Sequence, residues 1–150
     1  EFVFVTDLMP TILDLVDVEN HGGSWEGREI EPVVGTNFAS YLSQGQSPIH
    51  EPTEPIGYEL GGNSALFKGD YKIVMNRTGQ GDTEWSLYDI KSDPSEAYDL
   101  ADEKTDLLQA MIADYDDYVA ANGVLPMPAG YNRVLRILGP ALLQLRQDRH

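Results

Sequence analysis

Apolar and polar residues alternate over much of the segment 55–90, as they do in strands with one buried face. Four strands are predicted in this segment, over 56–60, 65–68, 71–77 and 85–90. Gly69-Asp70, between the second and third strands, is a two-residue hairpin signal, and Gly-rich stretches separate the others. Because short turns join antiparallel neighbours, we expect a four-stranded antiparallel meander with one covered face.

Apolar residues three and four positions apart predict a long helix after this sheet, over 105–121. Its apolar stripe consists of Leu107, Leu108, Met111, Ile112, Tyr115, Tyr118 and Val119. The aspartates Asp106, Asp114, Asp116 and Asp117 lie off this stripe and are interpreted as a solvated face. The stripe indicates a helix that packs its apolar side on a core.

The first twenty residues combine an apolar run with a short amphipathic helix. Residues 2–5, Phe-Val-Phe-Val, predict a strand, and 7–17 predict a helix that Thr6 or Asp7 can cap. The apolar face of this helix consists of Leu8, Ile12, Leu15 and Val16. Because the chain enters the strand directly after Glu1, we expect it to continue a longer polypeptide.

The remaining segments have weaker patterns. Residues 18–55 are rich in Gly, Pro, Ser and acidic side chains and predict a long connection with one short helix over 37–42. The sequence Asp-Pro-Ser-Glu indicates a further helix start, with Asp93 as the cap and Glu96 reaching back to the Asp93 N–H. Residues 131–147 have a helical pattern that Gly-Pro interrupts.

The composition of the 150 residues is that of a globular domain, but it is strongly acidic. Twenty-five Asp and Glu against 10 Lys and Arg give a formal net charge of −15. This balance argues against a nucleic-acid-binding protein, which normally carries a basic face, and against adsorption to an anionic membrane. Residues 131–150 differ, because they hold four arginines and one aspartate. No stretch approaches the roughly 20 apolar residues of a membrane span.

Candidate chemistry is sparse. The chain contains no cysteine, which excludes disulfides, zinc–thiolate sites and thiol catalysis within it. The histidines His21, His50 and His150 have no metal-ligand spacing, and no calcium loop, nucleophile elbow, phosphate-binding loop or dinucleotide fingerprint is present. His21 precedes two glycines and is interpreted as a turn residue, whereas His50, within P-I-H-E-P, is a candidate for lining a cleft. Motifs alone identify no catalytic constellation.

Three stretches, in order along the chain, resemble the type I sulfatases, in particular the bacterial arylsulfatase-like members of the alkaline phosphatase superfamily. They are F-V-F-V-T-D-L-M-P-T-I-L-D-L-V-D-V near the start, G-Y-E-L-G-G-N-S-A-L-F-K-G-D-Y-K-I-V, and W-S-L-Y-D-I-K-S-D-P-S-E-A-Y-D-L-A-D. The predicted helix over 105–121 occupies the place of that family's C-terminal helix. The resemblance covers about residues 1–125 and is most specific in L-Y-D…D-P-x-E-x-x-D-L after G-D-Y-K.

The resemblance implies an α+β fold: a four-stranded antiparallel sheet packed with a C-terminal helix, preceded by the last strand and helix of a truncated α/β catalytic domain. The resemblance implies four parts. The end of the catalytic domain would comprise residues 1–20, followed by a connecting segment over 21–54. The C-terminal subdomain would comprise 55–125, followed by a basic, partly helical tail over 126–150. The partner it implies is the upstream catalytic domain. The family uses calcium and a formylglycine made within C/S-x-P-x-R, but this sequence has no such motif, so the chain itself is expected to hold no cofactor.

In the family this subdomain helps wall the substrate cleft, and Glu59, Asn63 and His50 are the positions expected nearest to it. The chain alone is then expected to be an inactive part of a sulfuric ester hydrolase. Two alternatives stay open: an autonomous binding or oligomerisation module, which would form a homo-oligomer, and the C-terminal part of a phosphodiesterase or phosphonate monoester hydrolase of the same superfamily. Bacterial periplasm and cytoplasm are both compatible with the sequence.

Overall fold

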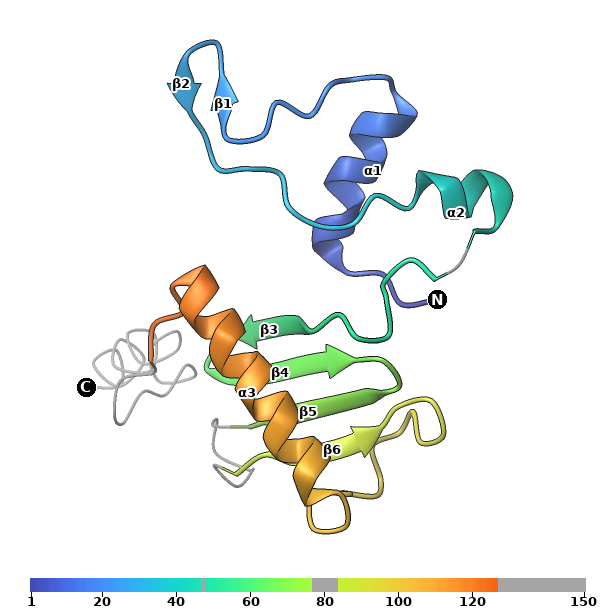
Figure 1. Cartoon of the computed structure of the whole chain (residues 1–150), viewed down its shortest axis with the longest axis vertical. Coiled ribbons are helices and arrows are strands. Elements are labelled where there is room, and N and C mark those ends of the chain that lie inside the picture. Colours follow the sequence, from blue (N-terminus) through green and yellow to red (C-terminus); the bar gives the residue numbers. More distant parts are fainter. Residues whose placement is uncertain (47, 77–83, 127–150) are drawn as a thin grey trace, which may run out of the picture. The chain divides into compact units, whose positions relative to one another are not determined.

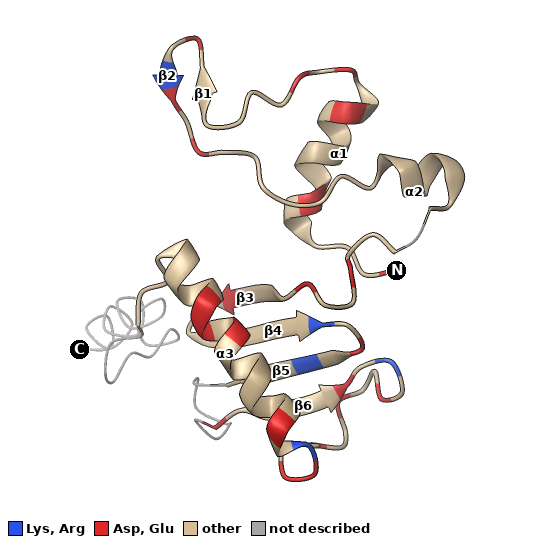
Figure 2. Cartoon of the chain, in the orientation of Figure 1, with Lys and Arg blue, Asp and Glu red and all other residues tan. Residues whose placement is uncertain are grey.

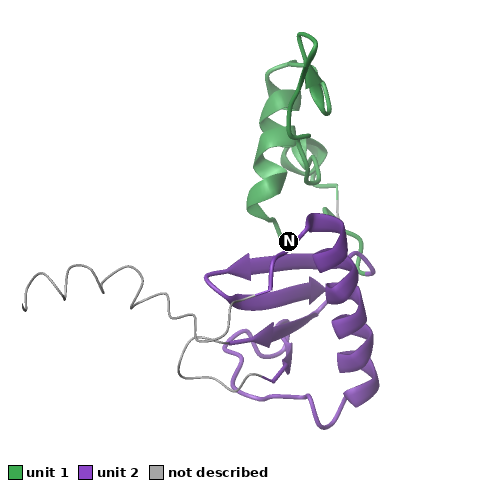
Figure 3. Cartoon of the chain, turned by 90° about the vertical axis from the view of Figure 1, so that its left-hand side faces the viewer, with its two compact units in different colours: residues 1–52 green, residues 53–150 purple. Residues whose placement is uncertain are grey.

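A computed structural model describes residues 1–46, 48–76 and 84–126 (Figure 1). It divides the chain into two compact units, Glu1–Pro52 and Thr53–His150 (Figure 3). The Gly-rich stretch 78–83, predicted to separate the third and fourth strands, lies outside the described residues. The predicted helix over 131–147 and the tail after 126 lie outside them as well. The four-part division drawn from the resemblance stays a prediction.

Unit 1 is built from short elements joined by long connections (Figure 1). Its elements are the 3-10 helix η1 (Val5–Asp7), α1 (Leu8–Leu15), the strands β1 (Ser24–Trp25) and β2 (Arg28–Glu29), and α2 (Ala39–Gln44). The structure confirms the two helices predicted over 7–17 and 37–42, although α1 and α2 begin and end at slightly different residues. The β1–β2 hairpin was not predicted. At its turn Glu26 and Gly27 both have a left-handed backbone, with φ of 48° and 76°, as a two-residue hairpin turn requires.

The predicted strand over 2–5 is wrong. Phe4 has an extended backbone, with φ −104° and ψ 157°, but its N–H donates to Asp7 Oδ2 at 2.6 Å and its carbonyl accepts from the Asp7 N–H at 3.0 Å. These two bonds turn the chain directly into η1. For the same reason Asp7 does not cap α1: its side chain makes no bond to the N–H groups of that helix.

The apolar residues of α1 are largely exposed. The helix buries only Thr11, whereas Leu8, Ile12 and Leu15 are 46%, 52% and 58% exposed. A helix of eight residues is marginal in water unless its apolar face is covered. We define the apolar stripe of α1 by the exposed residues Val5, Leu8, Met9, Ile12, Leu15 and Val16.

Unit 2 contains the predicted meander. Its sheet has the order β3-β4-β5-β6, with all pairs antiparallel. The strands are β3 (Ile56–Leu60), β4 (Asn63–Lys68), β5 (Tyr71–Met75) and β6 (Ser86–Asp89). The helix α3 (Thr105–Asn122) lies across one face of this sheet (Figure 1). The predicted α+β fold of this part is therefore confirmed.

The core of unit 2 lies between the sheet and α3. Leu66, Ile73 and Leu87 occupy paired positions on β4, β5 and β6, and all three are fully buried. The helix adds the predicted stripe, with Leu108, Met111 and Tyr115 buried and its other members packed around them. The Tyr118 ring packs directly on the backbone of β3 at Gly57. This contact requires glycine, because a Cβ at that position would overlap the ring.

The predicted helix at Asp93 is wrong: residues 93–100 form turns and irregular chain. Asp93 does accept bonds from the N–H groups of Ala97 and Tyr98. Glu96, however, adopts a left-handed φ of 55°, which ends any helical continuation, and its carboxylate binds Lys72 instead of the Asp93 N–H.

Charge is unevenly distributed between the two units (Figure 2). Residues 1–52 contain nine Asp and Glu but a single Lys or Arg, Arg28. All four lysines of the chain lie in unit 2. In the part of the chain that the structure describes, no helix combines the length and the hydrophobicity needed to cross a membrane.

Candidate functional site

The structure places the three predicted site residues in two regions. Glu59 lies on β3 and Asn63 begins β4, on either side of the Gly-Gly turn of one hairpin. His50 belongs to unit 1 and is described there by itself. The hairpin therefore brings together two of the three predicted positions.

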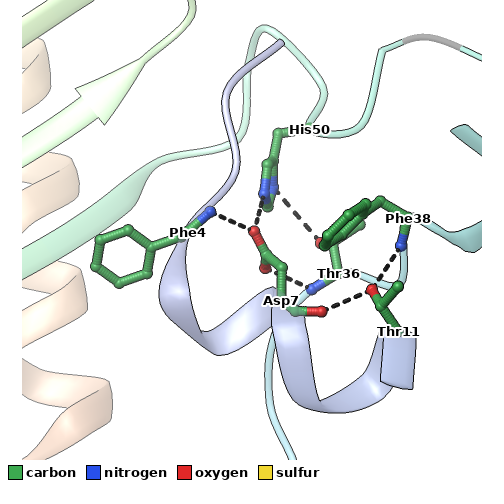
Figure 4. Close-up of polar contacts among 6 residues, drawn as sticks. All are labelled: Phe4, Asp7, Thr11, Thr36, Phe38 and His50. Carbon is green, nitrogen blue, oxygen red and sulfur yellow. Dashed lines mark hydrogen bonds and ion pairs between the residues drawn. The ribbon is translucent and has the colours of Figure 1, made fainter. Parts of the chain in front are cut away.

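His50 is bound to Asp7 at the start of α1 (Figure 4). Its Nε2 lies 2.8 Å from Asp7 Oδ2, and the two side chains are 9% and 1% exposed. A carboxylate only accepts hydrogen bonds, so Nε2 carries the proton in this contact. His50 Nδ1 lies 3.5 Å from the Thr36 hydroxyl, which can donate to a neutral ring or accept from a protonated one.

The same carboxylate holds the loop that precedes α2. Thr36 N–H donates to Asp7 Oδ1 at 2.8 Å, while the other oxygen serves His50 and Phe4 (Figure 4). Thr11 extends the contact, because its hydroxyl donates to the Asp7 carbonyl and accepts from the Phe38 N–H.

The loop passes so close to the helix start that only glycine fits beside it. Gly35 has a φ of 104°, and a Cβ there would overlap the carbonyl of Thr6. Thus the backbone itself packs against α1 at this point, and the side-chain bonds of Asp7 and Thr11 follow from that approach.

Hydrogen bonding keeps Asp7 charged despite its burial. Burial on its own raises the pKa of this carboxyl. The N–H groups of Thr36 and Phe4, together with His50, lower the pKa by more than burial raises it, so the net pKa lies below its ordinary value. Every charged or polar group in this cluster is used to join loop and helix. The contacts of His50 are structural, and its predicted place near a substrate cleft stays a prediction.

Glu59 lines a pocket of about 190 Å³ on unit 2. The other lining residues are Gly62, Ser64, Tyr115, Val119, Val124, Leu125 and Pro126. Tyr115, from the buried face of α3, donates its hydroxyl to Glu59 and lies 2.9 Å from Ser64 Oγ. Asn63 is not part of this lining, so the pocket contains one of the two predicted hairpin residues.

Glu59 places a negative charge beside this pocket. Burial raises the pKa of the neighbouring Tyr118, and the negative charge of Glu59 raises it further. Among the described residues, no Lys, Arg or His forms an ion pair with Glu59. The pocket was signalled in the sequence only by Glu59; Tyr115 was predicted as a core residue.

The L-Y-D…D-P-x-E-x-x-D-L signature, which begins in β6, has a structural explanation. Its aspartates accept backbone N–H groups: Asp89 from Lys91 and Ser92, Asp93 from Ala97 and Tyr98, and Asp99 from Leu87 and Ala101. These bonds lower the pKa of Asp89, whereas the pKa of Asp93 is lowered first by the hydroxyl of Ser95 and then by its backbone bonds. Burial raises the pKa of Asp99, but the hydrogen bonds of its carboxylate outweigh burial. The Asp99 bonds fasten the chain along the outer edge of β6, which protects that edge of the sheet.

The glutamate of the signature is also structural. Glu96 forms an ion pair with Lys72 of β5 at 2.5 Å, which connects the loop to the sheet. The most family-specific residues of the sequence thus stabilise the connection between β6 and α3.

These residues do not fit a metal site or a formylglycine. The described ranges contain no group of three or more His, Asp or Glu side chains that could hold a metal ion. The sequence has neither cysteine nor S-x-P-x-R. No catalytic step is therefore assigned to the described residues.

Comparison with known proteins identifies the relationship. Over 128 residues, 85% of this chain, the sequence is 36% identical to an uncharacterized sulfatase of Schizosaccharomyces pombe (strain 972 / ATCC 24843). The chain is a sulfatase homologue. The match spans only 23% of the length of that sulfatase. No family model matches the sequence.

The fold of this sulfatase homologue is found in solved structures. Two crystal structures of Ps i-CgsB, one of them in complex with k-i-k-neocarrahexaose, superpose with TM-scores of 0.54 and 0.52. Each covers 75% of this chain and 23% of the solved chain, at 22% sequence identity. These likenesses show a shared fold, again over about a quarter of the longer protein.

Proposed function

We propose that this chain is the C-terminal part of an arylsulfatase-like sulfuric ester hydrolase, that it walls the substrate cleft of that enzyme, and that it is inactive alone. The observation that carries the proposal is the match to a sulfatase over 85% of this chain but only 23% of the relative. The residues of the L-Y-D…D-P-x-E-x-x-D-L signature stabilise a loop, which supports a structural part of a larger enzyme.

The partner that we propose is the upstream catalytic domain. The apolar stripe of α1 supports it, because Ile12 on the helix is 52% exposed, and Val5 and Val16 at either end are 71% and 60% exposed. A large contiguous apolar surface usually marks an interaction site. Coverage of the stripe by more polypeptide accounts for this exposure, whereas an autonomous module would have to tolerate it or self-associate.

The reacting groups are proposed to lie outside this chain. In such an enzyme a hydrated formylglycine would attack the sulfur of the ester, and calcium with cationic side chains would stabilise the charge of the transferring group. Since the residues here fit neither group, their contribution is to hold and shape the cleft.

Within the cleft, Glu59 and Asn63 are proposed as the wall, with His50 as a third candidate. The sign of the charge limits what Glu59 can contact, because a carboxylate repels a sulfate group. It would therefore face an uncharged or positively charged part of a substrate.

The coding sequence upstream of Glu1 tests this proposal. We expect it to continue in frame and to encode C/S-x-P-x-R, the motif that supplies the formylglycine. A different nucleophile motif would instead support the phosphodiesterase or phosphonate monoester hydrolase alternative. A start codon at or immediately before Glu1 would contradict the proposed upstream domain.

A further inference from the structure

Glu59 differs from three other carboxylates of unit 2 that have a lysine partner. Asp70, Glu96 and Asp114 each pair with a lysine at 2.5 to 2.9 Å. The carboxylate of Glu59 accepts the Tyr115 hydroxyl through Oε1, and among the described residues its Oε2 has no hydrogen-bond donor. A partly buried carboxylate without a counter-charge is costly, because burial removes part of the water that would solvate its charge.

The walls around this carboxylate are apolar and aromatic. Val119, Val124, Leu125 and Pro126 contribute apolar side chains to the lining. Tyr115 is only 7% exposed, so its ring and hydroxyl are fixed by the core. A hydrocarbon stem can pack on such walls while its polar end reaches the carboxylate.

We propose that this pocket binds a hydrogen-bond-donating cation, a guanidinium or a primary ammonium group, against Glu59. The carboxylate can only accept, so its ligand must donate, and the negative charge selects a cation over a neutral donor. The neighbouring tyrosine rings add a favourable surface for a positive charge. The inference depends on unit 2 alone and stands whether or not the proposed sulfatase function holds.

Two sources can supply this group. One is a free amine or guanidine ligand. The other is an arginine of the chain itself, because Pro126, the last described residue, lines the pocket and the sequence continues with Arg133, Arg136, Arg146 and Arg149. The chemistry is the same for both, and the experiment must separate them.

The experiment follows amide shifts of Gly62 and Val124 by NMR in the full 150-residue chain. The probe is n-butylguanidinium, and its uncharged analogue n-butylurea is the ligand control. Glu59→Gln removes the charge but leaves an amide oxygen that can still accept from Tyr115. Glu103→Gln makes the same change of charge at an exposed residue outside the pocket. A fourth sample replaces all four tail arginines with glutamine.

If a free ligand is the source, the original chain and the arginine variant bind n-butylguanidinium equally, and neither binds n-butylurea. If the chain's own arginines are the source, the original chain does not respond and the arginine variant does. In both cases Glu59→Gln, made in the responding chain, weakens binding at least about tenfold, while Glu103→Gln leaves it unchanged. The proposal would be overturned if neither the original chain nor the arginine variant responded to n-butylguanidinium. It would also be overturned by an equal response to n-butylguanidinium and n-butylurea, or by undiminished binding in Glu59→Gln.

Discussion

Asp7 and His50 lie 43 positions apart in the sequence, yet Asp7 Oδ2 and His50 Nε2 are 2.8 Å apart in the structure. This contact closes a long connection onto the start of α1. The aspartate belongs to the T-D-L-M-P-T motif on which the family resemblance rests, and its physical role is visible in the structure. Its carboxylate accepts from the N–H groups of Phe4 and Thr36 and from the ring of His50.

Asp7→Ala is expected to unfold unit 1 more readily. It leaves two backbone N–H groups and the His50 ring without their acceptor in a buried place, which costs about 3 kcal/mol or more in free energy of unfolding. Urea unfolding followed by fluorescence of Trp25 measures it. Asp14→Ala, at an exposed position on the following helix α1, should cost less than about 0.5 kcal/mol. Equal effects of the two substitutions would contradict the assigned role.

The lowered pKa of Asp7 predicts a specific loss of stability in acid. Because the folded-state pKa lies below the ordinary value of 3.8, the unfolded chain binds more protons between those two values. The stabilisation is therefore complete above about pH 3.8 and is lost as the pH falls through the lower, folded-state pKa. Asp89, Asp93 and Asp99 contribute in the same direction, so the difference in stability between the original chain and Asp7→Asn isolates the contribution of Asp7. That difference should shrink with acidification; a constant difference would contradict it.

Gly57→Ala is expected to destabilise unit 2 by about 1 to 3 kcal/mol, because its methyl group would overlap the Tyr118 ring. The clash is specific, so the same substitution should cost much less when Tyr118 is replaced by leucine. Thermal unfolding of both single variants and the double variant measures the coupling. Gly23→Ala, whose added carbon would meet only the Ile30 carbonyl at 3.6 Å, is the matched control. Additive effects at positions 57 and 118 would refute the close contact.

Asp99→Ala should loosen the edge of the sheet. The Leu87 and Ala101 N–H groups lose their acceptor, for an expected cost of about 1 to 2 kcal/mol. Hydrogen exchange of the Leu87 amide reports it directly, since this amide should lose protection before those of β4. Asp102→Ala, at an exposed neighbouring position, should leave that exchange unchanged. Retained protection in Asp99→Ala would contradict the structural role of the signature.

Charged residues in the apolar stripe of α1 should have little effect on the 150-residue chain but a large effect on the longer protein. Ile12 and Leu15 are more than half exposed, so Ile12→Lys with Leu15→Lys should change the stability of the 150-residue chain by less than about 0.5 kcal/mol. Sedimentation of that chain should show reduced self-association. In the longer protein the same substitutions should bury two charges and reduce its folded yield severely. Destabilisation in the isolated chain alone would contradict an external partner.

The sheet and α3 could be predicted because their periodicities agree with their burial. The alternation through Tyr71, Ile73 and Met75 places β5 within two residues of its observed end, and the stripe on 105–121 locates α3 within one residue. Long periodic segments average over many side chains, so a single unusual residue does not mislead.

The predictions of secondary structure were wrong where a single side chain or a single backbone angle determines the local conformation. Asp93-Pro94 has every local sign of a helix start, but the left-handed φ of Glu96 and its ion pair with Lys72 depend on a distant strand. The apolar run before Asp7 has strand composition, yet its first hydrogen bonds go to the Asp7 carboxylate. His50 carried no signal of its partner, because a separation of 43 residues leaves no periodic trace.

The pocket shows a further limit. Glu59 lines a hollow on unit 2, while its place at a substrate cleft stays a prediction. Its companions Tyr115 and Ser64 are buried residues, and the apolar periodicity of the sequence gives no sign of their polar contacts. Asn63, predicted beside Glu59 from the same motif, lies outside that hollow because the two residues stand at different register positions of the hairpin.

Hydrolysis of 4-nitrophenyl sulfate tests the central claim most directly. The assay compares the 150-residue chain with the protein that includes the upstream coding sequence, at equal concentration. We predict turnover by the longer protein and none above buffer by the chain alone, because the chain has neither the nucleophile motif nor a metal-binding cluster among its described residues. Sustained turnover by the 150-residue chain, or a longer protein that hydrolyses bis(4-nitrophenyl) phosphate but no sulfate ester, would contradict the proposed function.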